Sequence, residues 1–183
     1  DNGTPRQVVQ APFGNGNAKG DLYNGGIHVP MIVKGPLVKV TPGSSTDTLV
    51  HCIDIFSTIL EIAGIDESAI PGLDARRVSS RSIIPILKGT DTTDRFVIAE
   101  RSGNNPGRAI IPDDYPDYKL IIFGDPDSNS DTPSIEFYNT GAPSNDINEQ
   151  NPLSIGGLSG TALDAYNACI AKDAEVGGGY NSL

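Results

Sequence analysis

The first strongly apolar run of the chain, residues 29–34, lies between segments rich in glycine and proline. A short run of this kind, entered through Gly25-Gly26 and followed by Gly35-Pro36, is typical of a buried strand, and we expect a parallel one. Residues 1–28 are polar and rich in glycine, which indicates loop structure. The pattern therefore predicts a long loop that leads into a buried strand.

Helical periodicity is strongest within residues 48–64. Asp54 can cap the start of a helix there, because a short carboxylate accepts backbone N–H bonds, and Gly64 can end it. One broad apolar face, which we expect to pack on a sheet, is formed by Ile55, Phe56, Ile59, Leu60, Ile62 and Ala63. A second, shorter helix or turn is expected at residues 82–89.

The second half of the chain alternates apolar runs with turn residues, which predicts a small antiparallel sheet. A terminal helix is expected to begin at Thr161, where Thr161–Asp164 resembles a capping box, and to end near Glu175. We expect Leu163, Tyr166, Cys169 and Ile170 to face inward. The four expected strands are residues 96–100, 108–112, 118–123 and 135–139.

The overall composition argues against several classes of partner. The 183 residues include 13 basic and 23 acidic side chains, for a net charge of −10, so we expect no nucleic-acid partner. No apolar run approaches the roughly 18 residues of a membrane span. Cys52 and Cys169 are the two cysteines, and the sequence alone leaves open whether they are buried free thiols or a disulfide.

Candidate chemistry gathers near the start of the chain. Asp1 and Asn2 offer oxygen ligands, which hard cations such as calcium and magnesium prefer. Lys19 adds a compact positive charge that can neutralise an anionic ester oxygen. These residues together suggest a site for a divalent cation and an oxyanion.

The order of these motifs resembles the sulfatases of the alkaline-phosphatase superfamily. Asp1-Asn2-Gly3 is followed by Lys19-Gly20 and by residues 23–30, Tyr-Asn-Gly-Gly-Ile-His-Val-Pro. The family pattern is D-N-G, a gap of some fifteen residues, then K-G-x-x-Y-E-G-G-x-R-V-P. This chain departs from it at Asn24, where the pattern has Glu, and at His28, where it has Arg. Weaker matches continue in order to about Leu153.

The resemblance implies roles for residues. Asp1 and Asn2 would be metal ligands, Lys19 would contact the sulfate, and His28 is a weaker candidate for a catalytic role. The metal would be calcium or magnesium. We expect the site to be empty in this chain alone, because calcium takes six to eight oxygens and two ligands do not hold it.

The family's nucleophile motif, C-x-P-S-R, does not occur in the chain. By the resemblance, the nucleophile is a formylglycine in the N-terminal half of a longer parent protein, and the chain alone is inactive. The chain would then be the C-terminal portion of the sulfatase fold, an α/β part followed by an α+β part. Residues 1–89 would complete the catalytic domain. Residues 90–183 would form a small subdomain with a four-stranded antiparallel sheet packed by a C-terminal helix.

Other candidate sites are weaker. His51 is interpreted as structural. Residues 125–131 with Glu136 carry carboxylates at calcium-loop spacing, but Ser130 stands where the loop needs glycine, so we expect a solvated hairpin tip.

The sequence therefore predicts a sulfuric ester hydrolase acting on a small sulfate ester or a sulfated glycan, together with its N-terminal half. The family resemblance suggests a periplasmic, lysosomal or extracellular location. Two alternatives stay open. One is a phosphate or phosphonate ester hydrolase of the same superfamily, and the other is a noncatalytic binding or structural domain.

Overall fold

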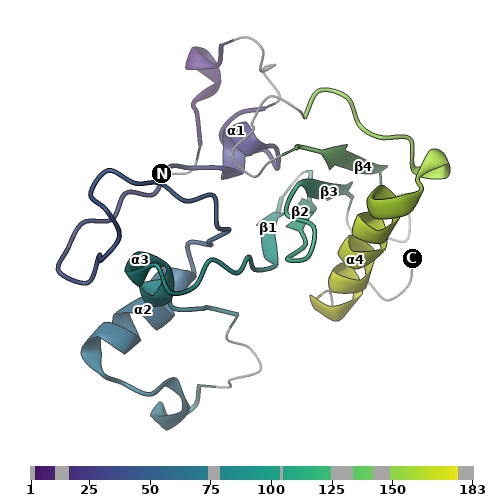
Figure 1. The fold of residues 1–183 in the computed structure, drawn as a ribbon. Helices are drawn as coiled ribbons and strands as arrows, with labels where there is room; N and C mark the ends of the chain where they lie inside the picture. Colours follow the sequence, from purple (N-terminus) through teal and green to yellow (C-terminus); the bar gives the residue numbers. More distant parts are fainter. Residues whose placement is uncertain are drawn as a thin grey trace. The chain divides into compact units, whose positions relative to one another are not determined.

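A computed structural model of the chain describes residues 3–10, 17–73, 79–103, 105–124, 134–141 and 149–176 (Figure 1). The chain divides into two compact units, which are treated separately below. The first unit joins Asp1–Met31 to Phe96–Leu183, and the second is Ile32–Arg95. The expected division of the parent fold into residues 1–89 and 90–183 stays a prediction.

The first unit is built on a four-stranded antiparallel sheet, which confirms the predicted strands. Each strand pairs with the next along the chain, so the order is β1-β2-β3-β4. The registers place Ala109 opposite Ile121 and Leu120 opposite Phe137. The strands are β1 (Val97–Arg101), β2 (Gly107–Ile111), β3 (Tyr118–Phe123) and β4 (Ser134–Asn139).

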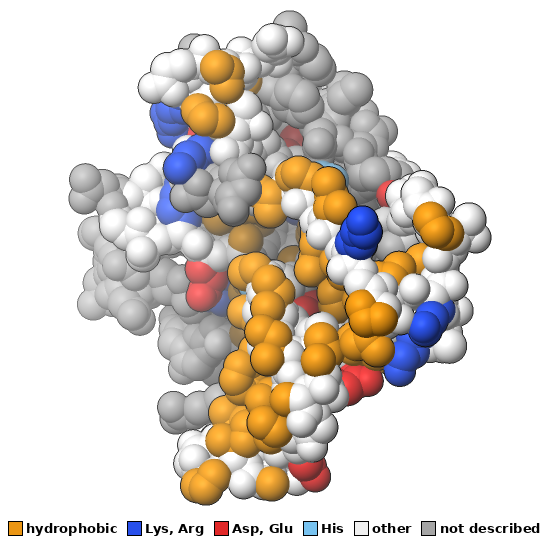
Figure 2. Space-filling view, turned by 90° about the vertical axis from the view of Figure 1, so that its left-hand side faces the viewer, with side chains coloured by type: hydrophobic (Ala, Val, Ile, Leu, Met, Phe, Trp, Pro, Cys, Tyr) orange, Lys and Arg blue, Asp and Glu red, His pale blue; other side chains and the backbone are white. Residues whose placement is uncertain are grey.

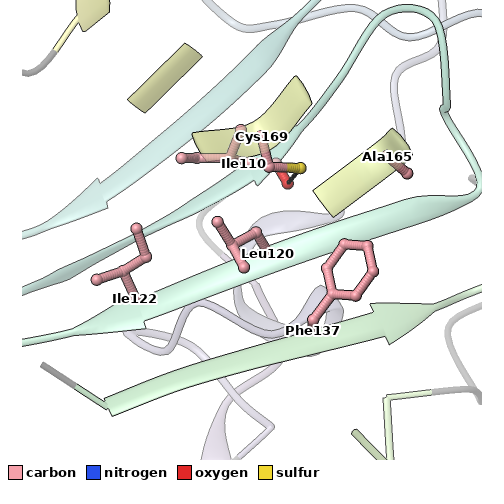
Figure 3. Packing of buried hydrophobic residues seen from close by; sticks show 6 residues of the cluster. All are labelled: Ile110, Leu120, Ile122, Phe137, Ala165 and Cys169. Atoms are coloured by element: carbon pink, nitrogen blue, oxygen red, sulfur yellow. Dashed lines mark hydrogen bonds between the residues drawn. The ribbon is translucent and has the colours of Figure 1, made fainter. Parts of the chain in front are cut away.

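The helix α4 (Gly160–Val176) covers one face of this sheet (Figure 3). Its small residues Ala165 and Cys169 lie one turn apart and are fully buried against β-strand side chains. The ring of Phe137 stacks on Tyr118 and meets Tyr166 edge-on, with ring centroids 5.6 and 5.4 Å apart. The sheet residues of this core are Ile110, Leu120, Ile122 and Phe137.

The inward face of α4 matches the predicted stripe at Tyr166 and Cys169 but differs from it at Leu163 and Ile170. Leu163 and Ile170 are 39% and 36% exposed. Asp173 is buried instead, on the same line as Ala165 and Cys169. Short side chains at this four-residue spacing let the helix approach the sheet closely, and this moves the contact line away from the larger residues.

Loop residues cover the opposite face of the sheet. Leu22 is buried there against Ala109, Ile121 and Tyr138. The short helix α1 (Asn24–Ile27) follows directly, and the 3-10 turn η1 (Arg6–Val8) precedes it in the chain. This face therefore positions the residues on which the sequence concentrates its candidate chemistry.

The second unit contains the two predicted helices, α2 (Asp54–Ala63) and α3 (Ile84–Lys88). Each ends at a left-handed glycine, Gly64 with φ of 67° and Gly89 with φ of 70°. A 3-10 turn, η2 (Glu67–Ala69), also lies in this unit. Local stop signals therefore end both helices where the sequence predicts.

Asp54 is buried within the second unit and is only 1% exposed to solvent. Its carboxylate accepts backbone hydrogen bonds from His51, at 2.8 Å, and from Arg81, at 2.9 Å. It also pairs with the Arg95 guanidinium. The helix start is therefore tied to two segments that are distant from it in the sequence.

The predicted face of α2 was wrong. Ile55, Phe56, Ile59 and Ile62 are 43–60% exposed, and Asp54, Ser57 and Thr58 are the buried residues. The polar side packs inward because its groups bond to residues 80–83: Ser57 N donates to Ser80 Oγ, and Ile83 N donates to Thr58 Oγ1. Figure 2 shows hydrophobic side chains gathered in a continuous column on the side where α2 lies in Figure 1.

The predicted buried strand at residues 29–34 is also absent from the described structure. Met31, Ile32 and Val33 are 45%, 94% and 40% exposed. A strand needs a neighbour to satisfy its backbone groups, and the four described strands pair only with one another. Among the described residues, no helix is both long and apolar enough to cross a membrane.

Candidate functional site

A pocket of about 340 Å³ opens in the first unit where the start of the chain meets the residues around α1. Two of the predicted site residues, Lys19 and His28, line it together, although eight residues lie between them in the sequence. The other lining residues are Gly3, Thr4, Pro5, Val29 and Pro30. The pocket therefore contains parts of all three motifs that carry the family resemblance.

Backbone hydrogen bonds join these motifs into one structure. Thr4 N donates to Gly25 O at 2.9 Å, and Lys19 N donates to Thr4 O at 2.8 Å. On the other side, His28 N donates to Asn24 O at 2.8 Å. Lys19 and His28 are thus both connected to α1 through main-chain bonds.

Glycine is required where these segments cross. Gly3 has φ of +93°, and a Cβ there would lie 2.6 Å from the carbonyl oxygens of Gly25 and Gly26. At Gly25 the added Cβ would meet Asn17 O at 1.9 Å. Real Cβ atoms do not approach a carbonyl this closely, so the glycines of both motifs serve close backbone packing.

The electrostatics of the pocket suit an anion. Lys19 is exposed, and no carboxylate of the described residues forms an ion pair with it. The nearby carboxylate of Asp21 instead pairs with Arg6 and Arg101, each at 3.0 Å. Arg101 also lies over the ring of Phe123, 5.4 Å from its centroid. The acidic group nearest in sequence to Lys19 is therefore engaged elsewhere.

The predicted metal ligands, Asp1 and Asn2, lie outside the described residues. Within the part of the chain that the structure describes, no group of three or more His, Cys, Asp or Glu residues could hold a metal ion. The metal site therefore stays a prediction, and so does its expected vacancy in this chain alone.

Sequence reasoning missed a buried polar cluster beside the pocket. Lys119, the second residue of β3, is 1% exposed and pairs with the carboxylate of Glu149. Lys119 Nζ also donates to Asn24 Oδ1 at 2.9 Å, and Asn24 N donates to Glu149 Oε2 at 2.5 Å. The one available signal was a lysine placed between apolar residues of a strand expected to be buried, which demands a partner.

A second, partly buried cluster joins two tyrosines to one carboxylate. Tyr23 and Tyr138 both donate to Glu136 Oε2, at 2.8 and 2.7 Å. Burial, and then the hydrogen bond to Glu136, raise the pKa of both tyrosines well above the usual range. The carboxylate of Glu136 is therefore already bound by two tyrosine hydroxyls. The other part of the calcium loop considered above, residues 125–131, lies outside the described residues.

Cys52, Cys169 and His51 lie outside the candidate pocket. Both cysteines are free, but Cys52 is exposed, so the expected burial holds only for Cys169. Burial raises the pKa of the Cys169 thiol to about 12. His51 Nδ1 accepts a hydrogen bond from Ile53 N at 3.2 Å at the start of α2, which agrees with its structural interpretation.

The comparisons with known proteins point to one group of enzymes. The chain is 27% identical to arylsulfatase K of Xenopus laevis over 121 residues, which is 60% of this chain and 20% of that protein. It is 39% identical to human N-acetylglucosamine-6-sulfatase over 71 residues, 39% of this chain and 11% of that protein. This chain resembles the sulfatases.

The resemblance extends to a bacterial enzyme. An ulvan-active sulfatase of Formosa agariphila is 31% identical over 81 residues, which cover 44% of this chain and 15% of that protein. The matched part of the chain thus spans one fifth or less of each of these sulfatases. No family model matches the chain, and no solved structure matches it. Of the positions that the sulfatase pattern covers, Lys19, His28, Val29 and Pro30 line the pocket described above.

Proposed function

We propose that the protein carrying this chain is a sulfuric ester hydrolase, and that the chain supplies the residue that contacts the sulfate. One observation carries this proposal: Lys19 and His28 line a single pocket with Gly3, the last residue of the Asp1-Asn2-Gly3 motif. The similarity to several sulfatases supports the same reaction class.

Lys19 is proposed to stabilise the charge on the sulfate oxygens. A sulfate monoester is an anion, and its hydrolysis changes the charge on oxygens that a fixed cation can stabilise. The exposed ammonium of Lys19 at the pocket rim has this character. His28, at the position of the pattern's arginine, would donate a hydrogen bond to the same anion.

The donor chemistry at the start of the chain fits a hard divalent cation. Asp1 and Asn2 offer one carboxylate and one amide oxygen, and they precede a glycine held at the pocket wall. Calcium or magnesium bound there would neutralise negative charge on the ester. Asp1 and Asn2 would hold it with further oxygen ligands from elsewhere in the protein, so the chain alone would bind it poorly.

The nucleophile is proposed to lie outside this chain. The chain contains no C-x-P-S-R motif, from which the family's formylglycine is made. We therefore propose that the 183 residues are inactive alone and act with an N-terminal half. In this proposal, residues 1–89 complete the catalytic α/β domain of a sulfatase fold, and residues 90–183 form its α+β subdomain.

The substrate class is proposed to be a sulfated glycan or a smaller sulfate ester. Two of the similar proteins are named for sulfated sugars, N-acetylglucosamine-6-sulfatase and the ulvan-active sulfatase. An open pocket of about 340 Å³ has room for a sulfate group with part of the ester attached.

Paired substrates test the reaction class. The full-length protein, produced in a host that forms formylglycine, is assayed on an aryl sulfate and on the matching aryl phosphate. We expect sulfate turnover that falls at least a hundredfold in Lys19→Ala and is partly retained in Lys19→Arg. Lys39→Ala, a lysine of the second unit, serves as the matched control.

Two results would overturn the proposal. Turnover of the phosphate alone would assign the protein to the phosphate or phosphonate ester hydrolases. The absence of turnover on either ester, together with an upstream sequence that lacks C-x-P-S-R, would favour a noncatalytic binding or structural domain.

A further inference from the structure

The buried ion pair between Lys119 and Glu149 lies next to the candidate pocket without lining it. Both side chains are 1% exposed, so neither can touch a substrate in this arrangement. They come from distant parts of the chain, the start of β3 and the segment after β4. Burying two charges is costly unless the geometry rewards it, so the pair calls for an explanation.

Asn24 connects this pair to the pocket. Its side-chain oxygen accepts a hydrogen bond from Lys119 Nζ, and its backbone N–H donates to Glu149. The ion pair thus fixes both the side chain and the backbone of Asn24. Its own carbonyl accepts the N–H of His28. The ion pair therefore fixes the position of Asn24, whose carbonyl oxygen accepts the backbone hydrogen bond of His28.

Backbone hydrogen bonds connect Lys19 to the short helix α1 as well. Gly25, directly after Asn24, accepts the N–H of Thr4, and Thr4 in turn accepts the N–H of Lys19. α1 has only four residues, and a helix of this length does not hold its shape alone. Tertiary bonds such as those at Asn24 must therefore keep it in place.

We infer that Lys119 and Glu149 are positioning residues of the pocket, which act on Lys19 and His28 through Asn24. The inference rests on the proposed function for its catalytic consequence. The sulfatase pattern has a glutamate at position 24, whereas this chain has a neutral asparagine there and Glu149 carries the negative charge. We therefore expect that a carboxylate at either position 24 or position 149 can serve as the partner of Lys119.

A charge swap tests this directly in the full-length protein. Glu149→Gln removes the carboxylate, and Asn24→Asp places one on the atom position that already contacts Lys119. We expect Glu149→Gln to lower kcat/KM for an aryl sulfate at least tenfold, and Asn24→Asp in the same chain to restore most of it. Backbone hydrogen exchange in peptides covering residues 19–30 should accelerate at least tenfold in the single variant and recover in the double variant.

The chain offers a matched control pair on the other face of the same sheet. Arg108 and Asp173 are also buried, with side chains 1% and 6% exposed, but they join β2 to α4. Arg108→Met should lower the unfolding midpoint without a selective change in exchange at residues 19–30. Two results would overturn the inference. In the first, Glu149→Gln and Arg108→Met, compared at equal stability, change kcat/KM and the exchange of residues 19–30 to the same extent. In the second, adding Asn24→Asp to Glu149→Gln restores neither kcat/KM nor the exchange.

The exchange measurement keeps this inference separable from the proposed reaction. If the wild type turns over no ester but residues 19–30 still loosen and recover as expected, the reaction class fails and the positioning role stands. If the wild type hydrolyses the sulfate but Glu149→Gln changes neither kcat/KM nor the exchange of residues 19–30, the positioning role fails alone.

Discussion

Arg108 Nη1 and Asp173 Oδ1 lie 3.0 Å apart between β2 and α4, in a site almost closed to solvent. Removing one member of a buried ion pair costs about 3–5 kcal/mol, because the other charge is left without compensation. The pair therefore holds α4 on the sheet in addition to the apolar contacts of Cys169 and Ala165.

Arg108→Met should destabilise the protein in a way that depends on pH. Desolvation already raises the pKa of Asp173, and Arg108 opposes this rise. Without the arginine, the folded state holds the Asp173 proton to a still higher pH, whereas the unfolded chain releases it near 4. The variant should lose about 3–5 kcal/mol at pH 7, and the loss should shrink as the pH falls, because protonation of Asp173 removes the uncompensated charge.

Denaturant unfolding at several pH values measures this effect. Arg108→Met with Asp173→Leu is the control, because the double variant leaves no buried charge and should regain much of the loss at pH 7. A destabilisation equal at pH 4 and pH 7 would contradict the electrostatic explanation.

The two cysteines should differ sharply in reactivity. Cys52 is exposed, whereas Cys169 is fully buried, with a pKa raised to about 12 and its Sγ 3.9 Å from Ile110 O. At pH 8 the native protein should be alkylated at Cys52 at least a hundredfold faster than at Cys169, because the thiolate is the reactive species. Mass spectrometry of the alkylated peptides measures both rates, and the difference should vanish in denaturant.

Gly25→Ala should disrupt the pocket. The new methyl would lie 1.9 Å from Asn17 O, so the crossing backbones must separate, at a cost of about 1–3 kcal/mol. Lys19 should lose its position, with a corresponding loss of aryl sulfate turnover. Gly156→Ala is the control, because nothing lies within 4 Å of a Cβ at Gly156. It should change the free energy of unfolding by less than about 0.5 kcal/mol and leave turnover unchanged.

The parts of the fold that local signals specify were predictable. The four strands follow the predicted apolar runs, which turn residues separate, and residues 112–117 lie between β2 and β3. α2 ends before Gly64, as predicted, because this left-handed glycine stops the helix locally. Such signals need no knowledge of the rest of the chain. The predicted cap at its start was wrong: the N-cap is Ile53, without a side-chain cap hydrogen bond, and the Asp54 carboxylate accepts the N–H of His51 instead.

The features that failed depend on distant partners. The apolar run at residues 29–34 matches a buried strand only if another strand pairs with it, and no described strand does. Periodicity shows that α2 has an apolar face but not which face the described chain covers. The contacts of Asn24 with Lys119 and Glu149 span 95 and 125 residues, beyond the reach of any local pattern. Lys19 and His28 line one pocket, and their closeness in the sequence let a local motif place them together.

Asp54→Asn should loosen the second unit selectively. The carboxylate accepts the backbone N–H groups of His51 and Arg81 and pairs with Arg95, whose own pKa is lowered by burial. An asparagine keeps one acceptor oxygen but turns an NH₂ group toward donors and leaves the arginine without its counter-charge. We expect a loss of about 3–5 kcal/mol from this unit.

Limited proteolysis within Ile32–Arg95, followed by mass spectrometry, provides the measurement for this variant. Asp66→Asn is a matched control, because Asp66 also accepts a backbone N–H, from Ser68, but is exposed to solvent. It should leave the cleavage rate nearly unchanged, since an asparagine caps a turn about as well as an aspartate. An asparagine can replace an aspartate that only accepts backbone N–H groups, but it cannot replace one that neutralises a buried arginine. Equal cleavage rates in the two variants would therefore contradict a counter-charge role for Asp54.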